Sequence, residues 1–405
     1  MFLRVTLPLV GGNFLNQAGR TVMAIVGPVL AVEFGLSASE LGLLAACMFA
    51  AYAAAQLPLG VALDTIGPRR LQTGLILVAA AGFAIFAAAS SLTGFMVARV
   101  LIGVGISAGL MALIKANSMW FPPSRVAAVT GYAMAIASLG SVMVTTPVEW
   151  AIPLIGWRGV FWGLAGMALA VSAVIFFAVA EKPSAAKRRS LAEELAVMRA
   201  IFGSATFWRY GPFPALASVM NFAYMGLWAG PWLRDVALFD GPARAQTLLG
   251  YTLAALLGSA LIGQWSSRLV AKGRSGFFVP LVCILFVIAG QLGLVLQPQE
   301  ALVVVGLWLV IAFFSAAGTA GYVAVGQLFP PEQTGRVSTA ANTLTLGVAF
   351  LLQSAIGWVL DLFPRTAANG WAPEGYSWAL GLSIGLQVFA TLNILGWRLP
   401  RRTAA

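Results

Sequence analysis

The chain has 405 residues, 60% of them hydrophobic and only 9% charged, a balance that excludes an ordinary soluble globular protein. Apolar stretches long enough to cross a bilayer recur throughout, which is typical of an all-α integral membrane protein. The 24 Lys and Arg exceed the 13 Asp and Glu. We attribute this excess to membrane orientation and not to nucleic acid binding.

The same composition leaves little material for catalysis or metal binding. The sequence has no histidine, and its two cysteines, Cys47 and Cys283, lie far apart within apolar stretches. We therefore expect no metal site, no cofactor, no structural disulfide and no enzymatic nucleophile–base pair. The first residues run into a long apolar stretch without a small-residue cleavage site, so we expect a retained first helix and not a removed signal peptide.

Hydropathy predicts twelve transmembrane helices. The spans cover approximately residues 6–32, 40–62, 71–90, 94–116, 126–150, 157–180, 210–234, 246–267, 277–296, 301–325, 337–362 and 376–397. With the amino terminus in the cytoplasm, most Lys and Arg fall in the inner loops, and only Arg158, Arg234, Arg244 and Arg365 fall in the outer ones. This asymmetry predicts that both termini are cytoplasmic.

The first span carries an arginine near the centre of an otherwise mostly apolar helix. Asn13, Asn16, Gln17 and Arg20 recur at spacings of three and four residues, so we expect them on one helix face. A charge at this depth is costly unless compensated, and arginine cannot readily lose its proton. No acid is predicted at mid-depth in any span. This favours Arg20 facing a central cavity and binding an anion.

The loop between spans 2 and 3 reads Gly60-Val-Ala-Leu-Asp64-Thr-Ile-Gly67-Pro-Arg69-Arg70. It resembles the signature loop between helices 2 and 3 of major facilitator superfamily transporters, from which it departs at Thr65 and Pro68. The resemblance implies two pseudo-symmetric six-helix halves that move solutes by alternating access. We expect Gly60 to let another helix approach closely. Five residues of the loop would latch the inner face between access states: Gly60, Asp64, Gly67, Arg69 and Arg70.

Residues 14–28 resemble the first helix of organic-anion carriers in the same superfamily, in which a first-helix arginine grips the negative group of the substrate. This resemblance implies that Arg20 binds the solute. Other polar residues of the spans would complete the site: Asn13, Asn16, Gln17, Tyr52, Gln56, Asn221, Tyr224, Trp228, Tyr322 and Asn342. Each of these alone also fits a helix–helix contact.

Three further charged residues lie within spans 4 and 5. The stretch Arg99-Val-Leu-Ile-Gly103-Val-Gly105 resembles a second superfamily motif, whose arginine is linked to proton coupling or to helix packing, and both roles stay open for Arg99. Lys115 either extends to the headgroups or faces the cavity. Glu149 is either a coupling group or an interface residue paired with Arg158. Only a glycine and a proline of the span 5 antiporter motif are present, which disfavours the drug-antiporter subgroup.

One long polar segment, residues 181–209, separates residues 1–180 from residues 210–405. It contains a basic run at 187–189 and then residues 191–202, whose apolar side chains recur at helical spacing. We expect an amphipathic helix on the inner membrane surface that links two six-helix halves. A repeat supports the duplication, because Phe-Pro-Pro occurs at residues 121–123 and again at 329–331, about half the chain apart.

These observations predict a monomeric secondary active transporter in the cytoplasmic membrane of a bacterium. It would move a small anionic organic solute by symport with H+ or Na+ or by exchange. Two alternatives remain open. One is an exporter of amphipathic, lipid-like or drug compounds, which keeps the fold but needs a larger apolar cavity. The other is a membrane sensor that binds a ligand without transporting it.

Overall fold

The computed structural model describes residues 1–180, 191–330, 333–366 and 369–395. Within these ranges the chain is helical, apart from one isolated β-bridge between Arg365 and Trp371. It divides into two compact units, Met1–Phe34 with Leu44–Ala196 and Gly35–Leu43 with Val197–Ala405. The basic run at 187–189 lies outside the described residues, as do residues 396–405.

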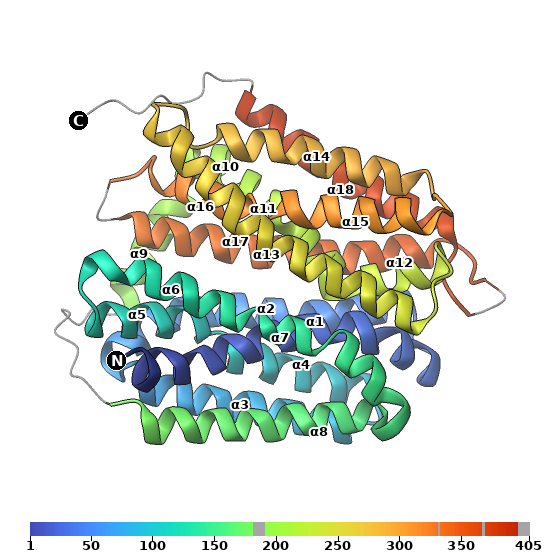
Figure 1. Ribbon diagram of the computed structural model, residues 1–405, viewed down its shortest axis with the longest axis horizontal. Helices are drawn as coiled ribbons and strands as arrows, with labels where there is room; N and C mark the ends of the chain where they lie inside the picture. Colours follow the sequence, from blue (N-terminus) through green and yellow to red (C-terminus); the bar gives the residue numbers. More distant parts are fainter. Residues whose placement is uncertain (181–190, 331–332, 367–368, 396–405) are drawn as a thin grey trace. The chain divides into compact units, whose positions relative to one another are not determined.

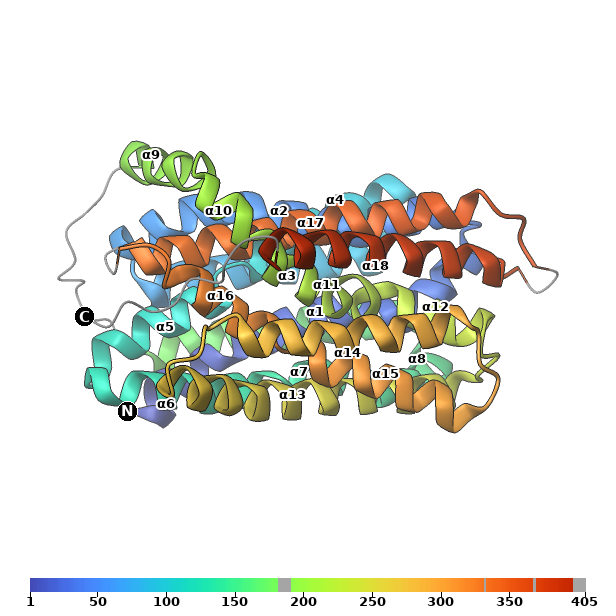
Figure 2. The same cartoon turned by 90° about the horizontal axis from the view of Figure 1, so that it is seen from above.

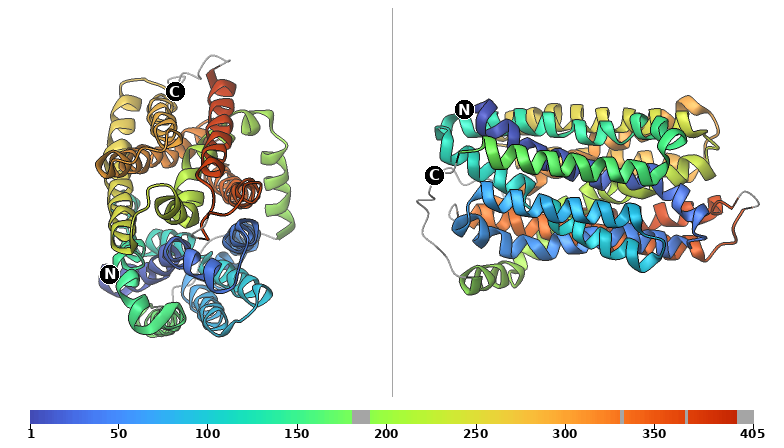
Figure 3. Two further views of the ribbon diagram at one scale, coloured as in Figure 1. Left: turned by 90° about the vertical axis from the view of Figure 1, so that its right-hand side faces the viewer. Right: turned by 90° about the horizontal axis from the view of Figure 1, so that it is seen from below.

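The first unit is organised around its first long helix. Its elements are η1 (Phe2–Thr6), α1 (Leu7–Glu33), α2 (Ala38–Thr65, most of which belongs here), α3 (Pro68–Ala88), α4 (Leu92–Ile106), α5 (Gly109–Trp120), α6 (Pro123–Ala137), α7 (Leu139–Met143) and α8 (Thr146–Ala178). The helix α1 contacts α3 to α8, and 78% of its most apolar stretch is buried. On the other side of the unit, α3 packs along both α4 and α8 (Figures 1 and 3). The side chains of the first span therefore reach six other helices of the unit, α3 to α8.

The second unit follows a similar plan with a more interrupted first span. Its elements are α9 (Leu191–Phe202, of which the part from Val197 belongs here), α10 (Ala205–Tyr210), α11 (Pro212–Val219), η2 (Met220–Trp228), α12 (Ala229–Asp235), α13 (Gly241–Ala271), α14 (Phe278–Val295), α15 (Ala301–Ser315), α16 (Gly318–Gly326), α17 (Thr334–Asp361) and α18 (Pro373–Leu395). The helix α15 packs against both α13 and α14 (Figure 2). A helix occupies 191–202 as predicted, with Met198 and Ile201 buried.

Ten helices in the described ranges are long and apolar enough to cross a membrane, against twelve predicted spans. Span 5 is missing from the ten because it is divided among α6, α7 and the start of α8. The helix α8 then continues into span 6 through a kink at Gly156, whose φ of 67° is not helical. Span 7 is missing because it is divided among α10, α11, η2 and α12. The count of twelve and the cytoplasmic termini stay predictions.

Spans 4 and 10 are interrupted at equivalent places. The break lies at Ser107–Ala108 between α4 and α5, and at Ala316–Ala317 between α15 and α16. A glycine follows each break, Gly109 or Gly318, at about the offset of the two Phe-Pro-Pro triplets. A Cβ on Gly109 would meet α1, and a Cβ on Gly318 would clash with α11. Each half therefore packs its broken span closely against its own first span.

Gly103 illustrates how tightly the first unit is packed. A Cβ added to it would clash with the backbone carbonyl oxygen of Met48 in α2. We expect Gly103→Ala to destabilise the protein by about 2 kcal/mol, because backbone cannot move aside as a side chain can. Gly163→Ala in α8 is the matched control, since a Cβ there meets no heavy atom within 4 Å. It should be neutral or stabilise by up to about 1 kcal/mol. Equal thermal unfolding midpoints for both variants in detergent would contradict this packing.

Candidate functional site

The first span presents a partly exposed stripe along one side of α1. Phe14, Gln17 and Arg20 are half-buried and follow one another at intervals of three residues. The guanidinium of Arg20 donates through Nη1 to Gln17 Oε1 at 3.3 Å. Asn13 and Asn16, by contrast, are each only 4% exposed. The predicted polar face is therefore divided, with Gln17 and Arg20 on the stripe and the two asparagines inside the unit.

Two amides that we predict at the solute site, Asn16 and Gln56, complete the break in span 4. A broken helix leaves carbonyl groups that need other partners, because no water is available in the bilayer core. Asn16 donates through Nδ2 to the Ile106 carbonyl oxygen at 3.0 Å and to the Tyr52 hydroxyl at 3.1 Å. Gln56 donates to the Ser107 carbonyl oxygen at 3.4 Å. Asn16 and Gln56 thus have a structural role that their spacing alone does not reveal.

The polar residues predicted on span 7 are also hydrogen-bonded within their own unit. Asn221 Oδ1 accepts from the Tyr251 hydroxyl at 2.8 Å, and the Tyr224 and Ser383 hydroxyls lie 3.5 Å apart. Trp228 donates its indole N–H to the Gln353 carbonyl oxygen at 3.2 Å. Tyr224 and Trp228 are almost fully buried, whereas Asn221 is half-buried. Of the three, Asn221 has the exposure that a ligand contact needs.

Spans 10 and 11 contribute two further half-buried polar residues, Tyr322 and Asn342. The Tyr322 and Thr345 hydroxyls lie 2.7 Å apart. The Asn342 side chain has no hydrogen bond within the described ranges of the chain and is half-buried. Its amide is therefore available to a polar ligand.

Span 7 contains a π-helix, a feature that sequence periodicity did not predict. The i→i+5 pattern runs over Met220–Trp228, and π segments inside helices are often found at functional sites. Gln353 in α17 donates through Nε2 to the carbonyl oxygens of Phe222 and Ala223, at 3.0 and 3.4 Å. One glutamine on span 11 thus supports the irregular backbone of span 7.

The loop between α2 and α3 has the geometry of a tight helix–helix connection. Gly67 adopts a φ of 88°, which favours glycine. Pro68 then begins α3 at the first helical position, where its missing N–H costs nothing, so this departure from the superfamily pattern fits the turn. The expected close approach of a helix to Gly60 is wrong for this structure, because a Cβ there would meet no heavy atom within 4 Å.

The charges beside this loop have partners inside the first unit. Lys115 Nζ lies 2.7 Å from Asp64 Oδ1, with the two side chains 22% and 28% exposed. Lys115 thus pairs with the loop carboxylate, an option that the sequence did not suggest. Arg69 donates to the Phe176 carbonyl oxygen at 2.9 Å and covers the Phe176 ring, whereas Arg70 is exposed.

The remaining charged candidates, Arg99 and Glu149, differ in burial and in their contacts. Arg99 is 1% exposed and donates through Nη1 to the Gly19 carbonyl oxygen at 2.9 Å. Glu149 is half-buried in the first turn of α8. Arg158 forms an ion pair with Glu33 at 2.8 Å, and the Trp157 indole donates to the same carboxylate at 2.6 Å.

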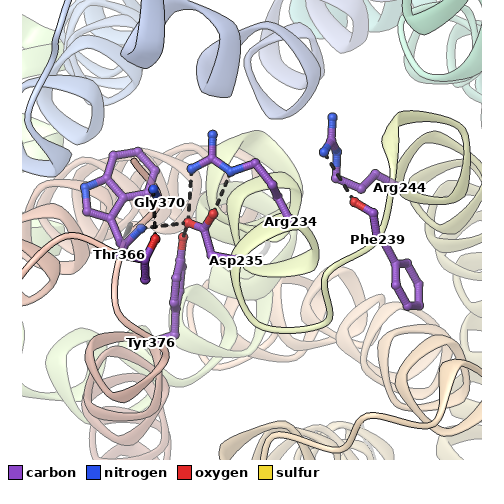
Figure 4. Close-up of polar contacts among 8 residues, drawn as sticks. Arg234, Asp235, Phe239, Arg244, Thr366, Gly370 and Tyr376 are labelled. Carbon is purple, nitrogen blue, oxygen red and sulfur yellow. Dashed lines mark hydrogen bonds and ion pairs between the residues drawn. The ribbon is translucent and has the colours of Figure 1, made fainter. Parts of the chain in front are cut away.

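A hydrogen-bond network around the buried carboxylate of Asp235 in the second unit was missed by the sequence prediction. The Asp235 side chain is only 3% exposed and accepts from Arg234 Nε at 2.6 Å and from the Tyr376 hydroxyl at 2.7 Å (Figure 4). It also accepts from the backbone N–H of Trp371 at 3.1 Å. These bonds fasten the loop before α18 to the end of α12. An acid directly after an arginine was the available signal, but the partners come from far along the chain.

Comparisons with known proteins identify the family to which this chain belongs. The model of the Major Facilitator Superfamily matches residues 9–354. The hexuronate transporter of Escherichia coli is 29% identical over 150 residues, 37% of this chain and 35% of that protein. A probable L-galactonate transporter of the same species is 32% identical over 164 residues, 39% and 35% of the two chains. The matched region thus spans about a third of the length of these curated relatives.

One relative aligns over more of the chain. A probable sulfoacetate transporter of Cupriavidus necator is 24% identical over 282 residues, covering 64% of this chain and 65% of that protein.

Solved structures share the fold over almost the whole chain. A bacterial homologue of the human lysosomal transporter Spinster superposes with a TM-score of 0.79 at 17% identity, covering 99% of this chain and 98% of that one. The xylose transporter XylE of Escherichia coli gives 0.72 at 15% identity, covering 100% and 99%. At these identities the likeness concerns the fold alone.

The Asp64–Lys115 pair is testable through stability. Because both side chains are partly exposed, we expect the pair to contribute only about 1 kcal/mol. Asp64→Lys should lower the thermal unfolding midpoint by bringing two cations together. The double variant Asp64→Lys with Lys115→Asp should recover most of that loss, and a double-mutant cycle measures the coupling. Additive effects of the two single changes would show that the pair contributes nothing.

Proposed function

Because this chain belongs to the Major Facilitator Superfamily, we propose that it is a secondary active transporter that moves a small organic anion by alternating access. Membership makes it an integral membrane transport protein and not an enzyme. The further elements of the proposal are the anionic solute, the bacterial cytoplasmic membrane, coupling to H+ or Na+ or exchange, and a monomeric state.

The half-buried guanidinium of Arg20 carries the proposal. It lies on the partly exposed stripe of α1, next to Gln17, in the most buried span of its unit. Arginine keeps its charge at any physiological pH and offers a planar set of donors that matches a carboxylate or sulfonate. A charge so placed within a membrane span is expected to serve function.

The names of the relatives agree with this choice of solute. Hexuronate, L-galactonate and sulfoacetate are small organic acids that carry a carboxylate, with a sulfonate as well in the last case. We propose that this chain takes a solute of that class. Gln17 would assist Arg20 within the first unit. In the second unit, Asn221, Tyr322 and Asn342 are the half-buried polar groups that stay predicted as solute contacts. Asn13, Asn16, Tyr52, Gln56, Tyr224 and Trp228 would shape the site from behind.

The alternatives fit the structure less well. An exporter of amphipathic compounds has no need of a permanent cation on the exposed stripe of α1. A sensor without transport shares the fold, and flux into proteoliposomes separates it from a transporter. Glu149 remains a candidate coupling group.

The proposal predicts that Arg20→Lys fails nearly as much as Arg20→Ala. A point charge does not replace a planar fork, so each change should lower the uptake of D-galacturonate into proteoliposomes by at least about 100-fold. Binding measured by calorimetry should weaken in parallel. Arg268→Ala is the control, because Arg268 is an exposed arginine at the end of α13, and it should behave as wild type. Wild-type affinity in Arg20→Ala would overturn the anion site and favour the exporter.

The loop between α2 and α3 should act in switching and not in binding. We expect Asp64→Asn to lower transport severely while leaving the affinity for the solute within about tenfold, or roughly 1.4 kcal/mol. The carboxylate would stabilise one access state, and apparent affinity follows the population of the competent state. Single-cysteine accessibility from each membrane side reports that population. Lost binding with an unchanged accessibility pattern would move Asp64 into the solute site.

A further inference from the structure

Arg99 is a buried cation without a counter-charge. Its side chain is 1% exposed in α4, and no carboxylate of the described residues lies within ion-pair distance of it. Its Nη1 donates to one backbone carbonyl oxygen, that of Gly19, at 2.9 Å. Its Nε is buried and has no hydrogen-bond partner within the described chain. The guanidinium is thus only partly satisfied in this structure.

Such an arrangement is expensive for a residue that only packs. Removing a charge from water is costly, and one hydrogen bond to a carbonyl does not compensate as a carboxylate would. An apolar side chain of similar length would fill the same space without that cost. A purely structural role therefore does not explain why an arginine stands at this position.

The acceptor of the Arg99 hydrogen bond lies next to the proposed solute site. Gly19 directly precedes Arg20 on α1, and a Cβ added to it would contact the side chains of Phe83 and Ile102. Gly19 has no side chain of its own, so Arg99 reaches the helix backbone itself. The bond therefore ties α4 to the turn of α1 that carries Arg20.

We propose that Arg99 is a positioning and specificity-determining residue for Arg20. It holds the Arg20 turn through the Gly19 carbonyl, and its uncompensated charge makes the site select a solute that carries a full negative charge. This inference rests on the proposed function. It assigns the missing counter-charge of Arg99 to the solute and not to the protein. Arg99 acts through Arg20 and the local potential, without touching the solute.

Two substitutions separate charge from packing. Arg99→Met keeps an unbranched apolar side chain and removes the charge, and Arg99→Lys keeps the charge but loses the planar fork. The probes are D-galacturonate and D-galactose, which differ in a carboxylate against a hydroxymethyl group. Affinity is measured by calorimetry on the purified full-length protein, and stability by thermal unfolding with and without each probe.

We expect Arg99→Met to weaken galacturonate binding about tenfold, because a charge held in a medium of low dielectric constant acts over several ångströms. Its preference for galacturonate over galactose should fall by a similar factor. The unfolding midpoint without solute should stay unchanged or rise, which a structural role would not produce. Arg99→Lys should keep the preference for galacturonate within about threefold of wild type, since the charge is present. Amide hydrogen exchange at residues 20–24 should quicken in Arg99→Met.

The outcomes distinguish this inference from the proposed function. If Arg20→Ala abolishes galacturonate binding while Arg99→Met binds and discriminates as wild type does, the role of Arg99 is overturned and the anion site stands. A lower unfolding midpoint for solute-free Arg99→Met, with an unchanged preference for galacturonate, would show that Arg99 only packs. If neither galacturonate nor sulfoacetate stabilises the wild-type protein, the proposed function fails and this inference fails with it.

Discussion

The backbone hydrogen bonds that a membrane helix loses when it breaks are the constraint on which this structure depends. In a bilayer core these groups have no water to turn to, so side chains must pair with them. Asn16 and Gln56 serve the carbonyls at the break in span 4, and Gln353 serves those of the π-helix in span 7. Each irregularity is thus supported by an amide from a neighbouring span of the same unit.

This constraint explains why a polar residue in a span can have either of two roles. An amide side chain on an apolar helix either binds a ligand or pairs with a backbone group of a neighbouring broken helix, and its spacing along its own helix does not distinguish the two roles. Gln17 and Asn16 are adjacent in sequence, yet one lies on the partly exposed stripe and the other completes a break in another helix. The acceptor of the Asn16 hydrogen bond, the Ile106 carbonyl oxygen, is 90 residues away in the chain, so a local sequence pattern cannot predict it.

The fold was predictable because hydropathy and length act over single helices. The all-helical architecture and a helix at 191–202 follow from such local signals, and the structure confirms them. The predicted loop at residues 60–70 is shorter than expected, because α2 continues to Thr65 and α3 begins at Pro68. The twelve predicted spans were not all found as continuous helices within the described residues, since the breaks between α6, α7 and α8 divide span 5 and the π-helix interrupts span 7. Charge partners were less predictable still: the pairs Lys115–Asp64 and Arg158–Glu33 join residues that meet only in the folded unit.

The π-helix also bears on how the first span of the second unit tolerates changes in length. A π turn holds more residues than an α turn, so Met220–Trp228 stores surplus chain within a continuous helical rod. Deleting one residue there would let the segment relax to α-helical pairing, and the residues that follow would keep nearly their present orientation. Deleting one residue from a purely α-helical stretch instead turns all that follows by about 100° about the helix axis. Trp232 and Asp235, both buried now, would therefore keep nearly their present directions after a deletion within Met220–Trp228. This short segment is thus more tolerant of a one-residue deletion than the α-helical segments on either side of it.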